Sequence, residues 1–263
     1  MNSRALVVAA ALIFAPSVAS ADGFPPPPPA AAEVYCCEPT LPLWTGVYLG
    51  TNIGGAWSKP DWQFPFVEAF STSPGQSFSP SASGWIWGGH VGLNYQIHHF
   101  LIGAEASYAG SRLKDTVTGP FAAAPTDQFI FGATDLFTAT GRVGIVAFHN
   151  QFLFYGKGGY ANSLVEVNAT SSTGVTARAK QRENGWVVGG GIESRMVGNI
   201  LFGLEYNYVN LPGDRFTGVT GGTGPAGPFN FDINNLQMHT VTARLSIRFG
   251  PHGCCSEGLI GKY

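Results

Sequence analysis

Hydrophobic and polar side chains alternate with a period of two through residues 84–111. Large apolar residues share one face in the first half of this stretch: Trp85, Trp87, Val91, Leu93 and Tyr95. Small or polar residues occupy the other face: Gly88, His90, Gly92, Asn94 and Gln96. After a break at Ile97 and His98 the alternation resumes, with Phe100 and Tyr108 on one face and Glu105 on the other. This period predicts two strands joined as an antiparallel hairpin.

The same order of features returns in residues 185–210. Gly185-Trp186 precedes a Gly-Gly pair, a tight turn, Gly203-x-Glu205 and a tyrosine. A repeated hairpin indicates a meander of equivalent hairpins. Further strands are predicted at 45–56, 136–148, from residue 152, and 238–249. This gives eight strands, joined alternately by short turns and by four long loops: 57–83, the stretch after 111, the stretch through 178–182, and 211–237.

The faces of these strands favour a membrane barrel over a soluble one. One face carries large apolar side chains, and the other carries glycine, amides and charges, which is the inside-out arrangement of a transmembrane barrel. Only 11% of the 263 residues are charged, against about a quarter in an ordinary soluble domain. Beyond the N-terminus no apolar run reaches the roughly 20 residues of a spanning helix. We therefore expect an all-β, eight-stranded antiparallel up-and-down transmembrane β-barrel.

The ends of the chain predict export and mark the domain boundaries. Arg4, an apolar run and Ala19-Ser20-Ala21 are typical of a cleaved signal peptide. The expected divisions are a signal peptide (1–21), a Pro-rich periplasmic linker (22–43), the barrel (44–250) and a periplasmic tail (251–263). The run Pro25 to Pro29 predicts a stiff spacer, with partner binding as the alternative.

Three groups of residues resemble a known family. They are the start Trp44-x-Gly46-x-Tyr48, the Gly-x-Glu motifs at Gly103, Gly191 and Gly203, and the run Leu153-x-Tyr155-Gly156-x-Gly158-Gly159. Together they are similar to the small outer-membrane barrel proteins of alphaproteobacteria, which include porin-like major surface antigens. The resemblance covers about residues 44–249 and implies an outer-membrane barrel with exposed, antigenic loops. Two features depart from it: the final strand aromatic, Phe249, is not terminal, and the chain carries cysteine pairs.

Eight charged residues are predicted to point into the lumen. They are Glu105, Arg142, Lys157, Glu193, Arg195, Glu205, Arg244 and Arg248. Around the barrel the signs of the six central ones run minus, plus, plus, minus, minus, plus, so most have an opposite neighbour. Because eight strands leave an interior only wide enough for side chains, we favour a plug of paired charges; a selective pore lining is the alternative.

The remaining chemistry is sparse. Cys36-Cys37 and Cys254-Cys255 flank the barrel, and export favours disulfides. We expect bonds between the two pairs, because adjacent cysteines are too close for ordinary disulfide geometry. A metal site is the alternative. The histidines show no serine at the spacing expected of a hydrolase, and His98-His99 point to opposite faces. We expect no catalytic residue, cofactor or metal.

These patterns predict a passive structural protein that presents four surface loops at the outer membrane. A narrow porin, a lipid-modifying enzyme and, more remotely, a soluble lipocalin-like binder are the alternatives. The expected partners are outer-membrane lipid and lipopolysaccharide, the barrel assembly machinery and a homo-oligomer. Fourteen Lys and Arg against sixteen Asp and Glu give a net charge of −2, which implies no nucleic acid.

Overall fold

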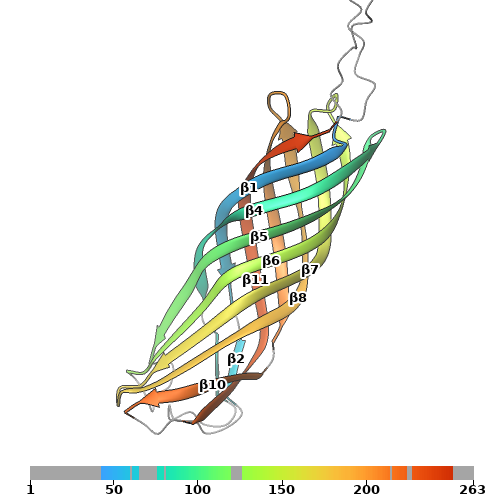
Figure 1. Ribbon diagram of the computed structural model, residues 1–263. Coiled ribbons are helices and arrows are strands. Elements are labelled where there is room, and N and C mark those ends of the chain that lie inside the picture. Colours follow the sequence, from blue (N-terminus) through green and yellow to red (C-terminus); the bar gives the residue numbers. More distant parts are fainter. Residues whose placement is uncertain are drawn as a thin grey trace, which may run out of the picture. The chain divides into compact units, whose positions relative to one another are not determined.

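Eight strands form a closed antiparallel barrel in the computed structural model (Figure 1). The structure describes residues 43–59, 61–64, 76–79, 81–119, 126–213, 215–223 and 227–250, all within the unit Glu38–Tyr263. The barrel strands are β1 (Gly46–Ser58), β4 (Ala82–Ile97), β5 (Phe100–Thr118), β6 (Gln128–Ala147), β7 (Phe152–Thr170), β8 (Val175–Arg195), β9 (Ile200–Pro212) and β11 (Pro228–Phe249). The expected fold class is confirmed.

The first and last strands close the ring. β1 pairs with β11 from Val47↔Phe249 to Ser58↔Met238, and with β4 on its other side. Three short turns, β4–β5, β6–β7 and β8–β9, lie at the rim where β1 begins and β11 ends. His98 and Asn150 adopt left-handed backbone conformations there, with φ of 55° and 63°, which asparagine and histidine tolerate better than most residues.

The half of the barrel next to the short turns is apolar outside, and its inner face carries buried charges. On β11 the outward Leu245 and Ile247 are 50% and 51% exposed, whereas the inward Arg244 is 2% exposed. Aromatic side chains edge this band. Those nearer the short turns are Tyr95, Phe100, Phe148, Phe154 and Phe249; those at the far edge, here called the upper girdle, are Trp57, Trp85, Trp87, Tyr108, Tyr160, Trp186 and Tyr206. An apolar band between two aromatic girdles is typical of a transmembrane barrel.

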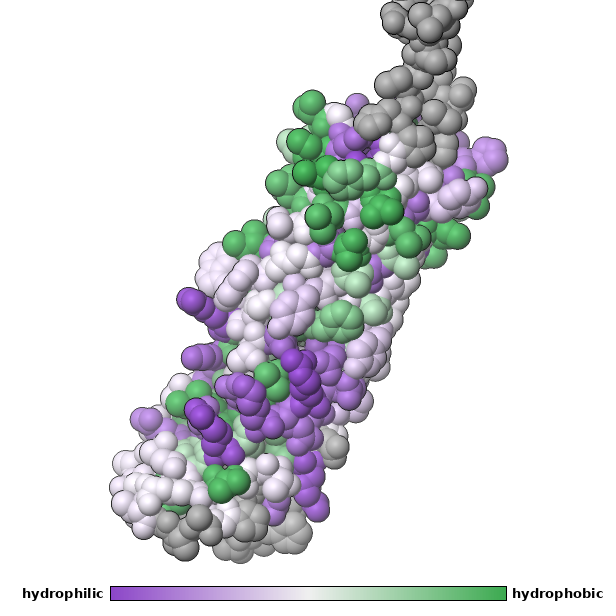
Figure 2. Space-filling view, in the orientation of Figure 1, coloured by the Kyte–Doolittle hydropathy of each residue, from purple (hydrophilic) through white to green (hydrophobic). Residues whose placement is uncertain are grey.

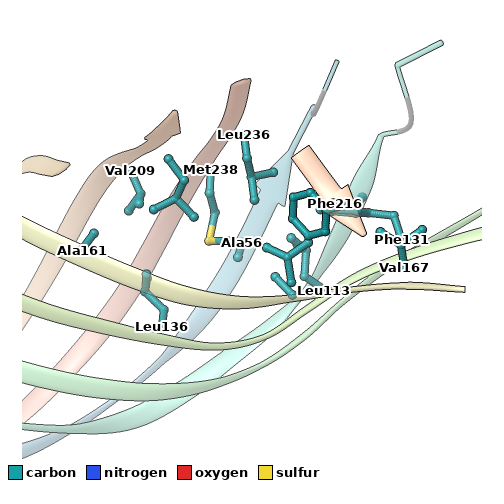
Figure 3. Packing of buried hydrophobic residues seen from close by; sticks show 14 of the residues in the cluster. Ala56, Leu113, Phe131, Leu136, Ala161, Val167, Val209, Phe216, Leu236 and Met238 are labelled. Atoms are coloured by element: carbon teal, nitrogen blue, oxygen red, sulfur yellow. The ribbon is translucent and has the colours of Figure 1, made fainter. Parts of the chain in front are cut away.

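Beyond the upper girdle the strands continue as a sleeve with the opposite polarity. Buried apolar side chains fill its interior, among them Leu113, Phe131 and Val167 from the barrel strands and Phe216 from β10 (Arg215–Gly222) (Figure 3). Its outer surface carries hydrophilic side chains, which gather over the front strands in Figure 2. Side chains therefore alternate with a period of two in both halves, but the apolar ones face outward in the membrane half and inward in the sleeve.

The sleeve corrects the predicted loops. β8 begins at Val175 and not near Gly185, and β11 begins at Pro228 and not at Met238. Much of what reads as loop is strand because Ala177 and Ala179, spaced by two, pack inward. Three short strands, β2 (Asp61–Phe64), β3 (Gln76–Phe78) and β10 (Arg215–Gly222), also lie in segments expected to be loops. β10 pairs with β8 and β11.

Two ladders shift register between the membrane half and the sleeve. The ladder between β5 and β6 is irregular between Gly110 and Leu113, and the ladder between β6 and β7 is irregular between Ala133 and Phe137. Such bulges bend strands and redirect side chains. They occur at the level of the upper girdle, where the polarity changes. Among the described residues no helix is long and apolar enough to cross a membrane.

Candidate functional site: the charged layer inside the barrel

Six charged side chains from six strands meet in the middle of the lumen. Glu105 (β5), Arg142 (β6), Lys157 (β7), Glu193 (β8), Glu205 (β9) and Arg244 (β11) are each between 2% and 6% exposed. Three are acidic and three are basic, so the layer is neutral overall. An isolated buried charge is costly, which makes pairing necessary for all six.

Glycines in the Gly-x-Glu motifs make room for this layer. The glycine lies two residues before its glutamate and therefore on the same inward face. A Cβ on Gly103 would come 3.1 Å from Arg142 Cγ, and one on Gly203 would come 2.8 Å from Glu193 Cγ. The motif thus combines a buried carboxylate with space for the side chain on the neighbouring strand.

Glu105 binds all three cations. Its Oε2 lies 3.4 Å from Arg142 Nη1, and its Oε1 lies 3.0 Å from Lys157 Nζ. Arg244 forms a further ion pair with Oε2. The hydroxyl of Tyr48 donates a hydrogen bond of 2.8 Å to the same carboxylate. Glu105 is therefore the centre of the charged layer.

The other two carboxylates complete the network. Glu205 lies 2.8 Å from Lys157 Nζ, pairs with Arg244, and accepts a 2.6 Å hydrogen bond from the Tyr155 hydroxyl. Glu193 lies 3.1 Å from Arg142 Nη2 and 3.8 Å from Arg244 Nη2.

Several of these pairs cross the lumen. Glu105 with Arg142 and Glu205 with Arg244 join neighbouring strands, as the order of signs indicates. Lys157, however, reaches Glu105 past β6, and Arg142 reaches Glu193 past β7. Alternating signs around the ring do not reveal these contacts, because the lumen is narrow enough for a side chain to reach past the neighbouring strand.

Two tyrosines belong to the site although the sequence analysis did not assign them to it. Arg142 lies over both rings, 5.4 Å from the centroid of Tyr48 and 3.9 Å from that of Tyr155. Its Nη1 also donates a 2.9 Å hydrogen bond to the Tyr48 hydroxyl. Stacking between aromatic rings stabilises a guanidinium and restricts its movement. The available signal was their inward position, which places both rings on the face that carries the charges.

Arg195 and Arg248 lie apart from this layer, near the short-turn rim. Arg248 donates to the Thr45 carbonyl at 2.8 Å and to Asn199 Oδ1 at 3.1 Å. Among the described residues neither arginine forms an ion pair with a carboxylate. The structure therefore brings together six of the eight predicted lumen charges.

Apolar layers lie on both sides of the charges. Toward the rim, the fully buried Trp44 packs in a cluster with Leu101, Val146, Leu153, Tyr155 and Leu201. Its backbone N–H and indole N–H donate to Gln96 Oε1 at 3.0 Å and to the Asn150 carbonyl at 3.1 Å. On the other side lies the sleeve core. Between the charged layer and the sleeve core is a gap of about 20 Å³, room for about one water molecule.

A serine–histidine contact is also present in the lumen. His90 Nε2 and Ser246 Oγ lie 2.8 Å apart, and both residues are 3% exposed. They come from β4 and β11, which flank β1, so their sequence positions gave no sign of the contact. His90 Nδ1 has no hydrogen-bond partner, whereas a nucleophilic triad needs a third group to orient the base.

Two further expectations concern the cysteines and a metal site. The four cysteines lie outside the described residues, so their pairing stays a prediction. Among the described residues no group of three or more His, Cys, Asp and Glu side chains is placed to hold a metal ion.

Comparisons with a family model and with known relatives agree with each other. A family model described as the outer membrane protein beta-barrel domain matches residues 38–249. The 31 kDa outer-membrane immunogenic protein of Brucella melitensis is 27% identical over 240 residues, covering 83% of this chain and 92% of that protein. The 25 kDa outer-membrane immunogenic protein of Brucella canis is 26% identical over 216 residues, covering 82% and 87%.

Solved structures with similar coordinates include OprG from Pseudomonas aeruginosa, with a TM-score of 0.49 and 12% identity over 78% of this chain and 97% of that chain. They also include the outer membrane protease OmpT from Escherichia coli, with a TM-score of 0.48 and 10% identity over 78% and 97%.

Proposed function

This chain belongs to the outer membrane protein β-barrel family, and we propose that it is a closed, non-conducting barrel that displays its sleeve and long connections at the cell surface. It is an outer-membrane protein, as the family and the Brucella relatives show. Those relatives are named as immunogenic proteins of the outer membrane. The surface role proposed here extends that property to this chain.

The orientation follows from the turns. Outer-membrane barrels place short turns in the periplasm and long connections outside. The rim with three short turns, where β1 begins and β11 ends, is then periplasmic, and the sleeve extends outward from the membrane. The sleeve, with β2, β3 and β10, would be the part of the molecule that antibodies and neighbouring cells meet.

The filled lumen is the observation that supports a non-conducting barrel. A solute crossing it would have to pass the Trp44 layer, the six paired charges and the sleeve core in series. Moving any one charged side chain aside would take a counter-charge away from its buried partners, which is strongly unfavourable. A narrow porin would need all three layers to open together.

We also propose that the barrel has no catalytic role. The buried pair His90 and Ser246 lacks both an orienting group on Nδ1 and access for a lipid. An enzyme on this chain would need a nucleophile, a base and an orienting group within hydrogen-bond reach of substrate.

Planar-bilayer recording of the refolded protein tests the proposal. We expect no steady ohmic steps, whereas a general porin inserted under the same conditions as a positive control should give them. Heat-modifiable gel mobility of the same preparation shows that the barrel is folded. Reproducible steps from folded protein would support the narrow porin instead.

A further inference from the structure

The outer surface of the sleeve carries basic side chains concentrated on two strands. They lie at every second position, facing outward: Arg112 and Lys114 on β5, and Arg178, Lys180 and Arg182 on β8. Although the whole chain is nearly neutral, these five cations form one band across β5–β8, here called the basic band. Hydrophilic side chains gather at this level in Figure 2.

The basic band begins directly above the upper girdle. The guanidinium of Arg112 lies 5.5 Å from the ring centroid of Trp87. Arg182 Nη1 donates 2.6 Å to Asn162, and Asn162 and Tyr160 both donate to Asn184. These contacts tie a cation on each strand to the girdle. Girdle aromatics lie at the headgroup level of a membrane, so the lowest cations lie at that level too.

The upper cations continue in register. Lys114, Gly132, Glu166 and Lys180 form one hydrogen-bonded row from β5 to β8. With strands about 4.8 Å apart, the two lysines on this row are about 14 Å from each other. Each lysine lies two residues, or about 7 Å along its strand, from the arginine that is nearer the upper girdle. The two basic stripes therefore flank β6 and β7.

Acidic side chains neutralise only part of the basic band. Glu166 lies 2.6 Å from Lys180 Nζ, and Asp135 lies 2.9 Å from Arg182 Nη2. The Asp115 carboxylate accepts a 2.8 Å hydrogen bond from the Ser81 backbone N–H. In the described part of the chain, Arg112, Lys114 and Arg178 form no ion pair.

We propose that the basic band is a binding site for the phosphate groups of lipopolysaccharide in the outer leaflet. Exposed cations just above an aromatic girdle are where anionic headgroups are recognised. Guanidinium groups suit phosphate because they donate in a planar fork. The site rests on the outward orientation of the sleeve in the proposed function. Binding would attach the barrel to its surrounding lipid along β5–β8.

Binding of purified lipopolysaccharide to the refolded protein in zwitterionic detergent tests this site. The double variant Arg112→Gln/Lys114→Gln should bind about 25-fold more weakly, about fivefold for each cation removed. The charge-preserving double variant Arg112→Lys/Lys114→Arg should bind like the wild type. Arg215→Gln on β10, which removes a cation paired with Asp232 of β11, should have little effect. Heat-modifiable mobility reports folding of every variant.

Two further probes identify the ligand chemistry. Lipopolysaccharide stripped of its phosphates should bind weakly and equally to all variants, and excess inorganic phosphate should compete poorly because it carries no acyl chains. Equal binding of intact lipopolysaccharide to the wild type and the neutral double variant would overturn the site. So would undiminished binding of the dephosphorylated lipid. Neither result would change the conductance of the barrel, so the closed-barrel proposal is tested separately.

Discussion

At the scale of single residues, burial decides how much an ion pair matters to this protein. Glu105 is 4% exposed and contacts three cations and the hydroxyl of Tyr48. The pair Lys180 and Glu166 also has a short contact, 2.6 Å, but its side chains are 56% and 30% exposed. Water competes for exposed charges and not for buried ones, so burial decides which pair matters more.

Arg142→Ala is expected to destabilise the barrel by about 3–5 kcal/mol, because Glu105 and Glu193 lose a buried counter-charge. Adding Glu105→Ala should cost less than the sum of the two single changes, since they share the lost contact. Urea unfolding of the refolded protein in lipid vesicles measures each value. Lys180→Ala is the control, at about 0–1 kcal/mol. Additive costs for Arg142 and Glu105 would show that the two are not coupled.

At the scale of strands, the sequence predicted the membrane half well and the sleeve poorly. The alternation on β11 placed Leu245 and Ile247 outside and Arg244 inside, as the structure has them. In the sleeve the same period is present, but its inner residues on β8 are the small Ala177 and Ala179. A weak apolar signal among Thr, Gly and Arg reads as loop, and only packing against the other strands identifies it as core.

Prediction of the charged layer from the sequence was limited in a similar way. Inward direction could be predicted for each charge, because a strand has only two faces. Pairs on neighbouring strands, such as Glu105 with Arg142, follow from the order of signs, but contacts such as Lys157 with Glu105 could not be predicted because they reach past a strand and depend on shear. Tyr48 and Tyr155 belong to the site because both rings contact Arg142, and no local sequence pattern gives these contacts.

Leu245→Arg should destabilise the barrel by about 2–4 kcal/mol, because it places a charge against the hydrocarbon of the membrane. Gln237→Arg is a matched control: it lies outward on the same strand but beyond the upper girdle, and should change stability by less than about 0.5 kcal/mol. Unfolding in lipid vesicles gives both values. Equal costs would contradict the position assigned to the upper girdle.

At the scale of the whole molecule, the barrel combines two kinds of interior. The membrane half holds neutralised charges, and the sleeve holds an apolar core like that of a soluble protein. The closed ladder between β1 and β11 leaves no free edge in the ring. The two interiors and the Trp44 layer therefore lie one above another in a single closed wall, and under the closed-barrel proposal each should block the lumen by itself.

If each layer closes the lumen by itself, variants that remove side chains from one layer should differ in conductance from variants that remove them from all three. Lys157→Ala/Glu205→Ala removes one cation and one anion that lie 2.8 Å apart, so it makes space while keeping the layer neutral. This variant should remain silent in planar bilayers, because the Trp44 layer and the sleeve core still close the lumen. Conductance steps are expected only when Trp44→Ala and Phe131→Ala/Phe216→Ala are added, which remove large buried side chains from the other two layers. Steady steps from the Lys157→Ala/Glu205→Ala variant alone would mean that the charged layer is the sole barrier, and the apolar layers would then have no sealing role.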